Sequence, residues 1–100
     1  MTNKVIVEVD SDLADLVPKF LANRQRDLLQ IGEAIDRADN NALLIIGHNM
    51  KGVGGGYGFN EITELGKRIE AAAKGGDQAV LREQLNQYKE YLANVEVRYV

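Results

Sequence analysis

Four stretches of this sequence repeat apolar residues at steps of three and four, and this spacing limits the fold more than any other feature. Such steps place the side chains on one face of an α-helix, which has to be buried against another element. The four stripes are Val17, Leu21, Leu28, Ile31, Ile35 and Ala38, with Arg24 in the one polar position; Leu43, Ile46, Met50, Val53 and Tyr57; Ile62, Leu65, Ile69 and Ala72; and Leu81, Leu85, Tyr88, Leu92 and Val95. Short connections between amphipathic helices favour antiparallel neighbours. The sequence therefore predicts an all-α fold, an antiparallel up-down four-helix bundle with its core in about residues 17–95.

The predicted helix ends follow from capping residues. Residues 39–41 (Asp-Asn-Asn) end the first long helix and supply a cap for the second, which runs from about Asn41 to the glycines near Gly55. The third helix starts near Asn60 and stops at Gly75-Gly76, and Asp77 then caps the fourth.

Both ends of the chain carry a different pattern. Residues 4–10 and 95–100 alternate apolar and polar side chains, as short strands do. Between the first alternating segment and the bundle, Ser11 is a suitable N-cap for a short N-terminal helix that reaches Pro18. An up-down bundle brings the two ends together, so they could pair as a two-stranded ribbon. The alternative is that the C-terminal tail continues the last helix and frays.

Length and composition narrow the class of protein. A chain of 100 residues fits a single domain, 1–100, and its lack of cysteine excludes disulfides and thiol nucleophiles. The net charge of -3, with scattered basic residues, argues against nucleic acid as a partner. We find no signal peptide and no apolar run of about 18 residues, so we expect a cytoplasmic protein that does not enter the membrane. The initial Met1 suggests a free-standing protein, and we expect a monomer.

The only histidine, His48, falls on the side of the second helix that points away from the predicted core. At roughly 100° per residue, it lies about 160° around the helix from Ile46 and from Met50. A solvent-facing surface usually carries Glu, Lys and Gln, and exposed aliphatic side chains instead indicate docking of a partner. The residues beside His48 are Leu44 and Ile45 on one side and Lys51, Gly52 and Gly55 on the other. We predict that Leu44, Ile45, Gly52 and Gly55 form a docking surface.

Glycines are concentrated in the same helix, at Gly47, Gly52, Gly54, Gly55 and Gly56, although each costs about 1 kcal/mol of helix stability relative to alanine. Gly52 and Gly55 lie on the histidine side, where missing side chains let a partner backbone come close. For Gly54 and Gly56 we favour packing between neighbouring helices, or the end of the helix.

Residues 48–58 (His-Asn-Met-Lys-Gly-Val-Gly-Gly-Gly-Tyr-Gly) resemble the motif of histidine-phosphotransfer domains. The match comprises His48, Lys51, Gly52 and Gly58, with Met50 in an aliphatic position, and Leu65, Ile69 and Glu70 resemble the family's following helix. The sequence departs at Val53 and Tyr57, where smaller and aliphatic residues are usual, and this affects partner fit rather than phosphate chemistry. The resemblance covers about residues 17–92.

This resemblance implies a phosphorelay carrier. His48 would accept a phosphoryl group from a receiver phospho-aspartate or a sensor histidine kinase, and pass it to a response-regulator aspartate. A free imidazole is largely neutral at pH 7, so a ring lone pair can attack phosphorus. Lys51, one turn away, would stabilise the charge of the phosphoryl group. The receiver would supply Mg²⁺, so we expect no cofactor bound by this chain.

Helix geometry adds two candidate supporting residues. The third helix doubles back and, at about 1.5 Å per residue, reaches the level of His48 near Lys67 to Glu70. Glu70 could accept a hydrogen bond from the non-reacting ring nitrogen, or could be a solvated charge that repels phosphate. Lys67 could add positive potential.

Two other functions remain as alternatives. The first is an interaction bundle whose His48 is never phosphorylated. The second is an autonomous enzyme, which the sequence disfavours because it has no Gly-rich loop after a strand and ending in Gly-Lys-Ser/Thr. A single histidine among scattered carboxylates also gives no paired metal ligands, so we expect no metal site.

Overall fold

The computed structural model describes residues 4–100; Met1, Thr2 and Asn3 of the predicted domain lie outside the described residues. It is mostly helical, with four helices and one small two-stranded sheet, as expected for a helical bundle. The elements are β1 (Val5–Val9), a 3₁₀ helix (Ser11–Leu13), α1 (Val17–Asp36), α2 (Asn40–Gly54), a second 3₁₀ helix (Gly55–Tyr57), α3 (Asn60–Gly75), α4 (Gln78–Asn94) and β2 (Val95–Tyr99). Within residues 4–100, no helix is both long enough and apolar enough to cross a membrane.

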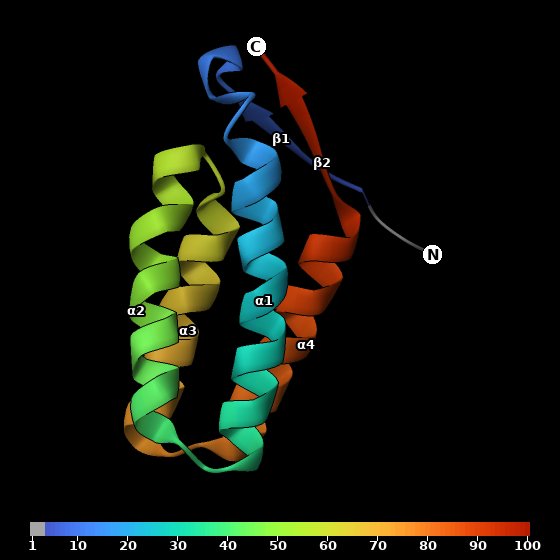
Figure 1. The fold of residues 1–100 in the computed structure, drawn as a ribbon. Helices are drawn as coiled ribbons and strands as arrows, with labels where there is room; N and C mark the ends of the chain where they lie inside the picture. Colours follow the sequence, from blue (N-terminus) through green and yellow to red (C-terminus); the bar gives the residue numbers. More distant parts are fainter. Residues whose placement is uncertain (1–3) are drawn as a thin grey trace.

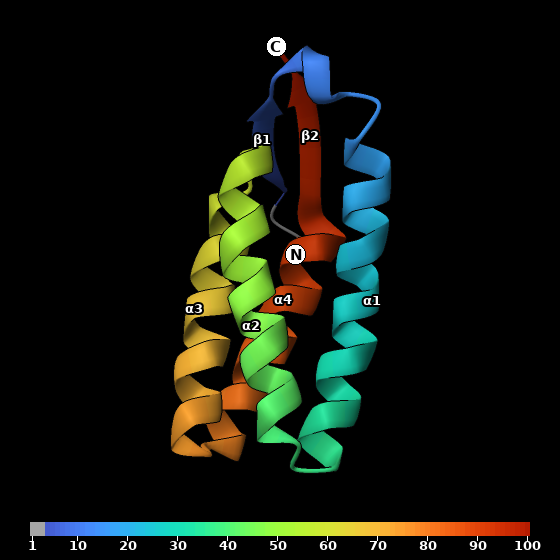
Figure 2. The same cartoon turned by 60° about the vertical axis from the view of Figure 1, so that its left-hand side comes forward.

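The four helices lie side by side, and the connections alternate between the two ends of the molecule (Figure 1). The α1–α2 and α3–α4 connections are at the lower end of that view, whereas the α2–α3 turn and both strands are at the upper end. The main helix contacts join α2 to α3, α1 to α4, α3 to α4 and α1 to α2. The turned view in Figure 2 shows the two strands standing above α4, next to the upper end of the bundle.

The buried residues follow the predicted stripes closely. All four predicted positions of α3 are buried, and so are Leu43 and Met50 of α2. One predicted position is wrong: Ala38 is exposed and has a left-handed φ of 53°, because α1 already ends at Asp36. The predicted stripe also omitted Phe20 and Ala34, which are buried in α1. Phe20 stacks on Tyr57 and Phe59, with ring centroids 4.3 and 5.2 Å apart, and so closes the upper end of the core.

Arg24 occupies the one polar position in the α1 stripe, and its neighbours explain why. Its Nε lies 2.8 Å from Oδ2 of Asp27, and its guanidinium lies over the ring of Phe20. The fully buried Tyr88 of α4 donates its hydroxyl hydrogen to the same Asp27 oxygen at 2.9 Å. Burial raises the pKa of Asp27 above its usual value, against the opposing effect of Arg24 and Tyr88. Ion pairing and hydrogen bonding thus allow polar groups at the α1–α4 contact.

The capping residues predicted from the sequence are confirmed for α2 and α4, whereas the one predicted near the N-terminus of the chain is wrong. Asp39 accepts a hydrogen bond from the backbone N–H of Ala42, and Asp77 accepts one from that of Val80. Near the N-terminus, Asp10 rather than Ser11 is the capping residue, and the helical turn is only a 3₁₀ helix at Ser11–Leu13. A three-residue element of this kind serves as a connector between β1 and α1.

The two chain ends pair as a parallel ribbon, which confirms the extended segments and contradicts a frayed C-terminal helix. Val5 is opposite Val95, and the register continues to Val9 opposite Tyr99. Val9 of β1 is buried in the core, and Val97 of β2 packs against the core. A two-stranded ribbon is marginal alone, and contact with the bundle core provides the burial it needs.

Candidate functional site

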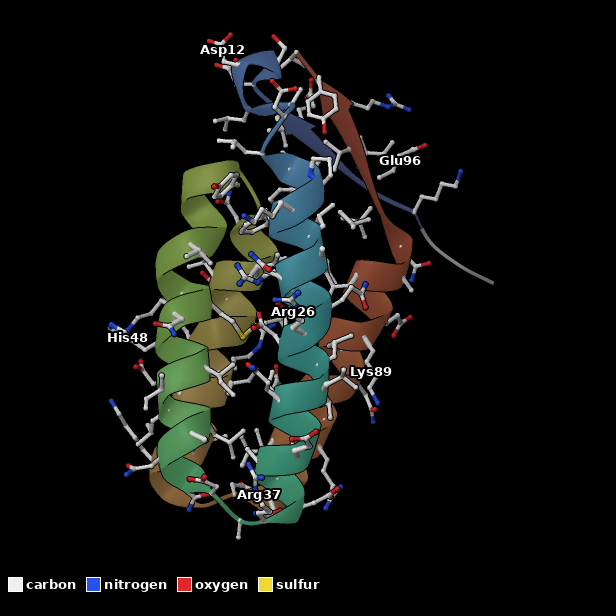
Figure 3. The ribbon with its side chains drawn as sticks, viewed as in Figure 1. Asp12, Arg26, Arg37, His48, Lys89 and Glu96 are labelled. Atoms are coloured by element: carbon white, nitrogen blue, oxygen red, sulfur yellow. The ribbon has the colours of Figure 1, made fainter. Side chains whose placement is uncertain are left out.

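His48 lies in α2 and points away from the bundle (Figure 3). Its side chain is 70% exposed, whereas Gly47 and Met50 on the other side of the helix are buried. The helical position alone produces this orientation, as predicted from the sequence. The imidazole is therefore open to a partner from outside the molecule.

Glu70 of α3 lies between His48 and Lys51. Its Oε2 is 3.4 Å from Nδ1 of His48, and its Oε1 accepts a hydrogen bond from Nζ of Lys51 at 2.9 Å. The Glu70 side chain is only 18% exposed, because it lies against α2. The structure thus brings together three of the residues selected from the sequence. Nε2 is the ring nitrogen that faces away from Glu70.

The surroundings of Glu70 keep it ionised. The hydrogen bond from Lys51 is the main reason why the pKa of Glu70 lies below its ordinary value of 4.5. Partial burial acts in the opposite direction, and the charges of Lys51 and Lys74, with the contact to His48, lower the pKa further. A negative carboxylate favours the imidazole tautomer that carries its hydrogen on Nδ1, so the lone pair is left on Nε2.

Close contact between α2 and α3 brings Glu70 to His48, and two glycines permit it. A Cβ atom on Gly47 would lie 2.8 Å from the backbone nitrogen of Glu70 and 2.9 Å from the carbonyl oxygen of Gly66. A Cβ atom on Gly66 would lie 2.7 Å from the backbone nitrogen of Lys51. Because the obstructing atoms belong to the backbone, a side chain at either position would force the two helices apart.

The remaining glycines of α2 and of the 3₁₀ helix that follows it fall into two groups. Gly54 belongs with Gly47, since a Cβ there would lie 2.6 Å from Oγ1 of Thr63, and this confirms its packing role. An added Cβ at Gly52 or Gly56 would meet nothing within 4 Å, and at Gly55 only Thr63 at 3.8 Å. Packing therefore does not explain Gly56, which instead lies in the 3₁₀ helix that directly follows the end of α2, the other role expected from the sequence. Gly52 and Gly56 leave the helix surface bare beyond His48, towards the upper end of the bundle.

The other predicted site residues occupy three different environments. Ile45 is 62% exposed and borders a groove between α1 and α2, whereas Leu44 is half-buried and packs against the core. Lys67 forms an ion pair with Glu64 at 3.4 Å on its own helix. Ile45 therefore presents the larger apolar surface beside His48.

Two residues near the site were missed from the sequence. Lys74 lies four residues after Glu70 and lowers its pKa, and this i, i+4 spacing of opposite charges was a readable signal. Thr63 donates a hydrogen bond to the carbonyl oxygen of Lys51 at 3.4 Å, which ties α3 to the helix that carries His48. Nothing local in the sequence marks Thr63 for this contact.

Among residues 4–100, no group of three or more His, Asp or Glu side chains could hold a metal ion. The groups at the site are an exposed imidazole, a paired carboxylate and an ammonium group.

Comparison with protein families identifies a match over most of the chain. A family model described as "Hpt domain" matches residues 15–97. The matched range contains α1 to α4 with all the site residues described above. Searches of curated proteins and of solved structures returned no match.

Proposed function

The chain belongs to the Hpt domain family, which has a histidine-phosphotransfer role in phosphorelays, and we propose that His48 is the residue that carries the phosphoryl group. The observation that supports this most directly is the position of His48, exposed on α2 with Glu70 against Nδ1 and Lys51 one turn away. It is also the only histidine of the chain.

In the proposed reaction, Nε2 of His48 attacks the phosphorus atom of a receiver phospho-aspartate. The N–P bond forms as the P–O bond to the aspartate breaks, and the aspartate leaves as a carboxylate. Reversal of these steps on another receiver passes the group on. Glu70 accepts the hydrogen on Nδ1, which holds the reacting lone pair on Nε2 and balances the positive charge that develops on the ring.

Besides pairing with Glu70, Lys51 also stabilises the phosphoryl group in this proposal. Its ammonium group has three hydrogens, of which one is donated to Glu70. The others can reach the phosphoryl oxygens, so Lys51 offsets the negative charge that Glu70 would otherwise place near phosphate. Lys67 remains a candidate for additional positive potential, although its ion pair in this structure is with Glu64.

The docking surface that we propose for the receiver surrounds His48 on α2. Exposed Ile45, with Leu44 beside it, gives an apolar contact on one side, and Gly52 and Gly55 give a bare helix surface on the other. The receiver supplies Mg²⁺ and the acceptor aspartate. A sensor histidine kinase is the alternative donor.

Hpt domains are generally phosphocarriers rather than enzymes, and we propose the same for this chain. We also assign its bundle to the antiparallel up-down class, supported by the alternating helix connections in Figure 1. The cytoplasmic location and the absence of a bound cofactor stay predictions.

The test is phosphate transfer from a phosphorylated receiver domain with Mg²⁺. Wild type should acquire acid-labile, alkali-stable phosphate, and His48→Gln should acquire none while keeping its helical circular dichroism, since the side chain faces solvent. Asn49→Gln is the matched control, because it changes the exposed neighbour and should label normally. Label on His48→Gln would refute the site, and wild type that binds several receivers without being labelled would favour an interaction bundle.

A further inference from the structure

A groove lies between α1 and α4, away from His48. Its volume is about 630 Å³, and its apolar lining residues are Leu28, Leu29, Gly32 and Leu85. Its other lining residues are Gln25, Arg26, Glu33 and Lys89. Neither the proposed phosphate chemistry nor the proposed receiver surface uses any of these side chains.

A projecting leucine and a recess occur next to each other in this groove. Leu29 is 70% exposed, more than any other large apolar side chain within residues 4–100. Gly32 lies about one turn further along α1, and an added Cβ there would be 3.8 Å from Leu85, which is an ordinary contact distance. Internal packing therefore does not require glycine at position 32, although glycine weakens the middle of a helix.

We propose that a second copy of this chain covers the groove, with the two α1 helices antiparallel about a two-fold axis near Leu29. A two-fold interface needs a surface that is complementary to itself. Leu29 of each copy would pack into the recess beside Gly32 of the other, so one helix supplies both the projection and the recess.

Charge on α1 supports a second copy as the occupant. Arg26 lies three residues before Leu29, and Glu33 lies four residues after it, both on the same side of the exposed face. The two-fold axis therefore brings Arg26 of one copy next to Glu33 of the other, and the same pair forms twice. None of the ion pairs among residues 4–100 involves Arg26 or Glu33, so both charges are available.

The proposed interface leaves the phosphate site open. In Figure 3, His48 projects from α2 on one side of the molecule, whereas Arg26 and Lys89 lie on α1 and α4, across the front and the opposite side. Both histidines of a dimer would remain accessible to receivers. The proposal does not rest on phosphotransfer, and it replaces the sequence-based expectation of a monomer.

The α1 surface that the proposed dimer would bury is small, so the affinity between the two copies should be low. The 20 residues of α1 give a strip about 30 Å long and about 10 Å wide, less than the roughly 800 Å² per partner of a standard stable interface. We therefore expect a weak dimer that dissociates on dilution.

Sedimentation velocity over a concentration series of the full chain tests this. The mass should rise from 11.1 kDa towards twice that value with concentration. Leu29→Glu should raise the dissociation constant at least about tenfold, because it places a charge in the apolar recess beside Gly32 of the other copy. Leu16→Glu is the matched control, since it changes an exposed leucine that precedes α1 and does not line this groove, and it should leave the dimer unchanged.

Charge exchange distinguishes a second copy from any other occupant. Arg26→Glu alone and Glu33→Arg alone should each weaken the dimer, and the double variant should restore it, because both pairs then re-form with reversed sign. A single mass of 11.1 kDa at every concentration would refute the proposal. So would a dimer that persists in Leu29→Glu, or a double variant that dimerises no better than the single ones. Circular dichroism of each variant checks that the helices are intact.

Discussion

Glu70 is the residue on which the geometry of the site depends most. One carboxylate contacts both the imidazole of His48 and the ammonium group of Lys51. Counting residues along two antiparallel helices predicted its level beside His48, but not that it would pair with Lys51. That pairing depends on how closely α2 and α3 approach, which no single helix encodes.

The lowered pKa of Glu70 predicts how its contribution to stability depends on pH. Because its pKa in the folded protein is below the ordinary 4.5, ionised Glu70 stabilises the fold above pH 4.5, and this stabilisation is lost as the pH falls through the folded pKa. Glu70→Gln should therefore be less stable than wild type at about pH 7, and the difference should shrink towards about pH 3. Urea unfolding of both proteins at the two pH values measures this. An equal difference at both would contradict an ionic role for Glu70.

At the scale of the helices, α2 and α3 are held in contact by glycines that face each other. The sequence shows how many glycines α2 and α3 contain, but it does not distinguish a glycine at a helix contact from a glycine on an open surface. In the structure, Gly47, Gly54 and Gly66 face backbone or side-chain atoms of the neighbouring helix, and Gly52 and Gly56 face open space. Of the two roles expected for these glycines, Gly54 therefore has the packing role, whereas Gly56 lies at the end of the helix.

This difference predicts opposite effects of the same substitution. Gly66→Ala should lower the free energy of unfolding by about 1–3 kcal/mol, because its Cβ would overlap backbone atoms of α2. Gly52→Ala should raise it by up to about 1 kcal/mol, because alanine is the better helix former and the site has room. Urea denaturation of the two variants beside wild type is the measurement. If both were destabilised alike, the open position assigned to Gly52 would be wrong.

At the scale of the whole molecule, the paired chain ends cover the upper end of the bundle. Val9 is buried only because β1 lies against the core, and β2 holds β1 in place along five paired residues. The His48 site lies along α2, away from this ribbon, as Figures 1 and 3 show. Stability and phosphate acceptance should therefore be separable.

Truncation after Asn94 tests that separation. Removing residues 95–100 deletes β2 and uncovers apolar side chains of β1, so the free energy of unfolding should fall by about 2 kcal/mol. Labelling of His48 at low temperature should be retained. Thermal unfolding of the truncated chain measures its stability, and phosphate transfer to it measures the labelling of His48. A truncated protein as stable as wild type would show that the ribbon contributes nothing to the core.

The four helices, the caps at Asp39 and Asp77, and the outward direction of His48 could all be predicted from the sequence. These features depend on residues a few positions apart, and such local relations are encoded directly in the spacing of side chains along the chain. The alternating ends were also visible, although two interpretations of them remained open.

Which surfaces of the elements contact one another could not be predicted from the sequence. The parallel pairing of β1 with β2, the Lys51–Glu70 hydrogen bond and the close contact of Gly47 with Gly66 join residues that are far apart in the chain. Such contacts depend on the distance and angle at which whole elements pack, and many sequences with the same periodicity would pack differently. The helices were therefore predictable from local chemistry, whereas the arrangement around His48 follows from how α2 and α3 fit together.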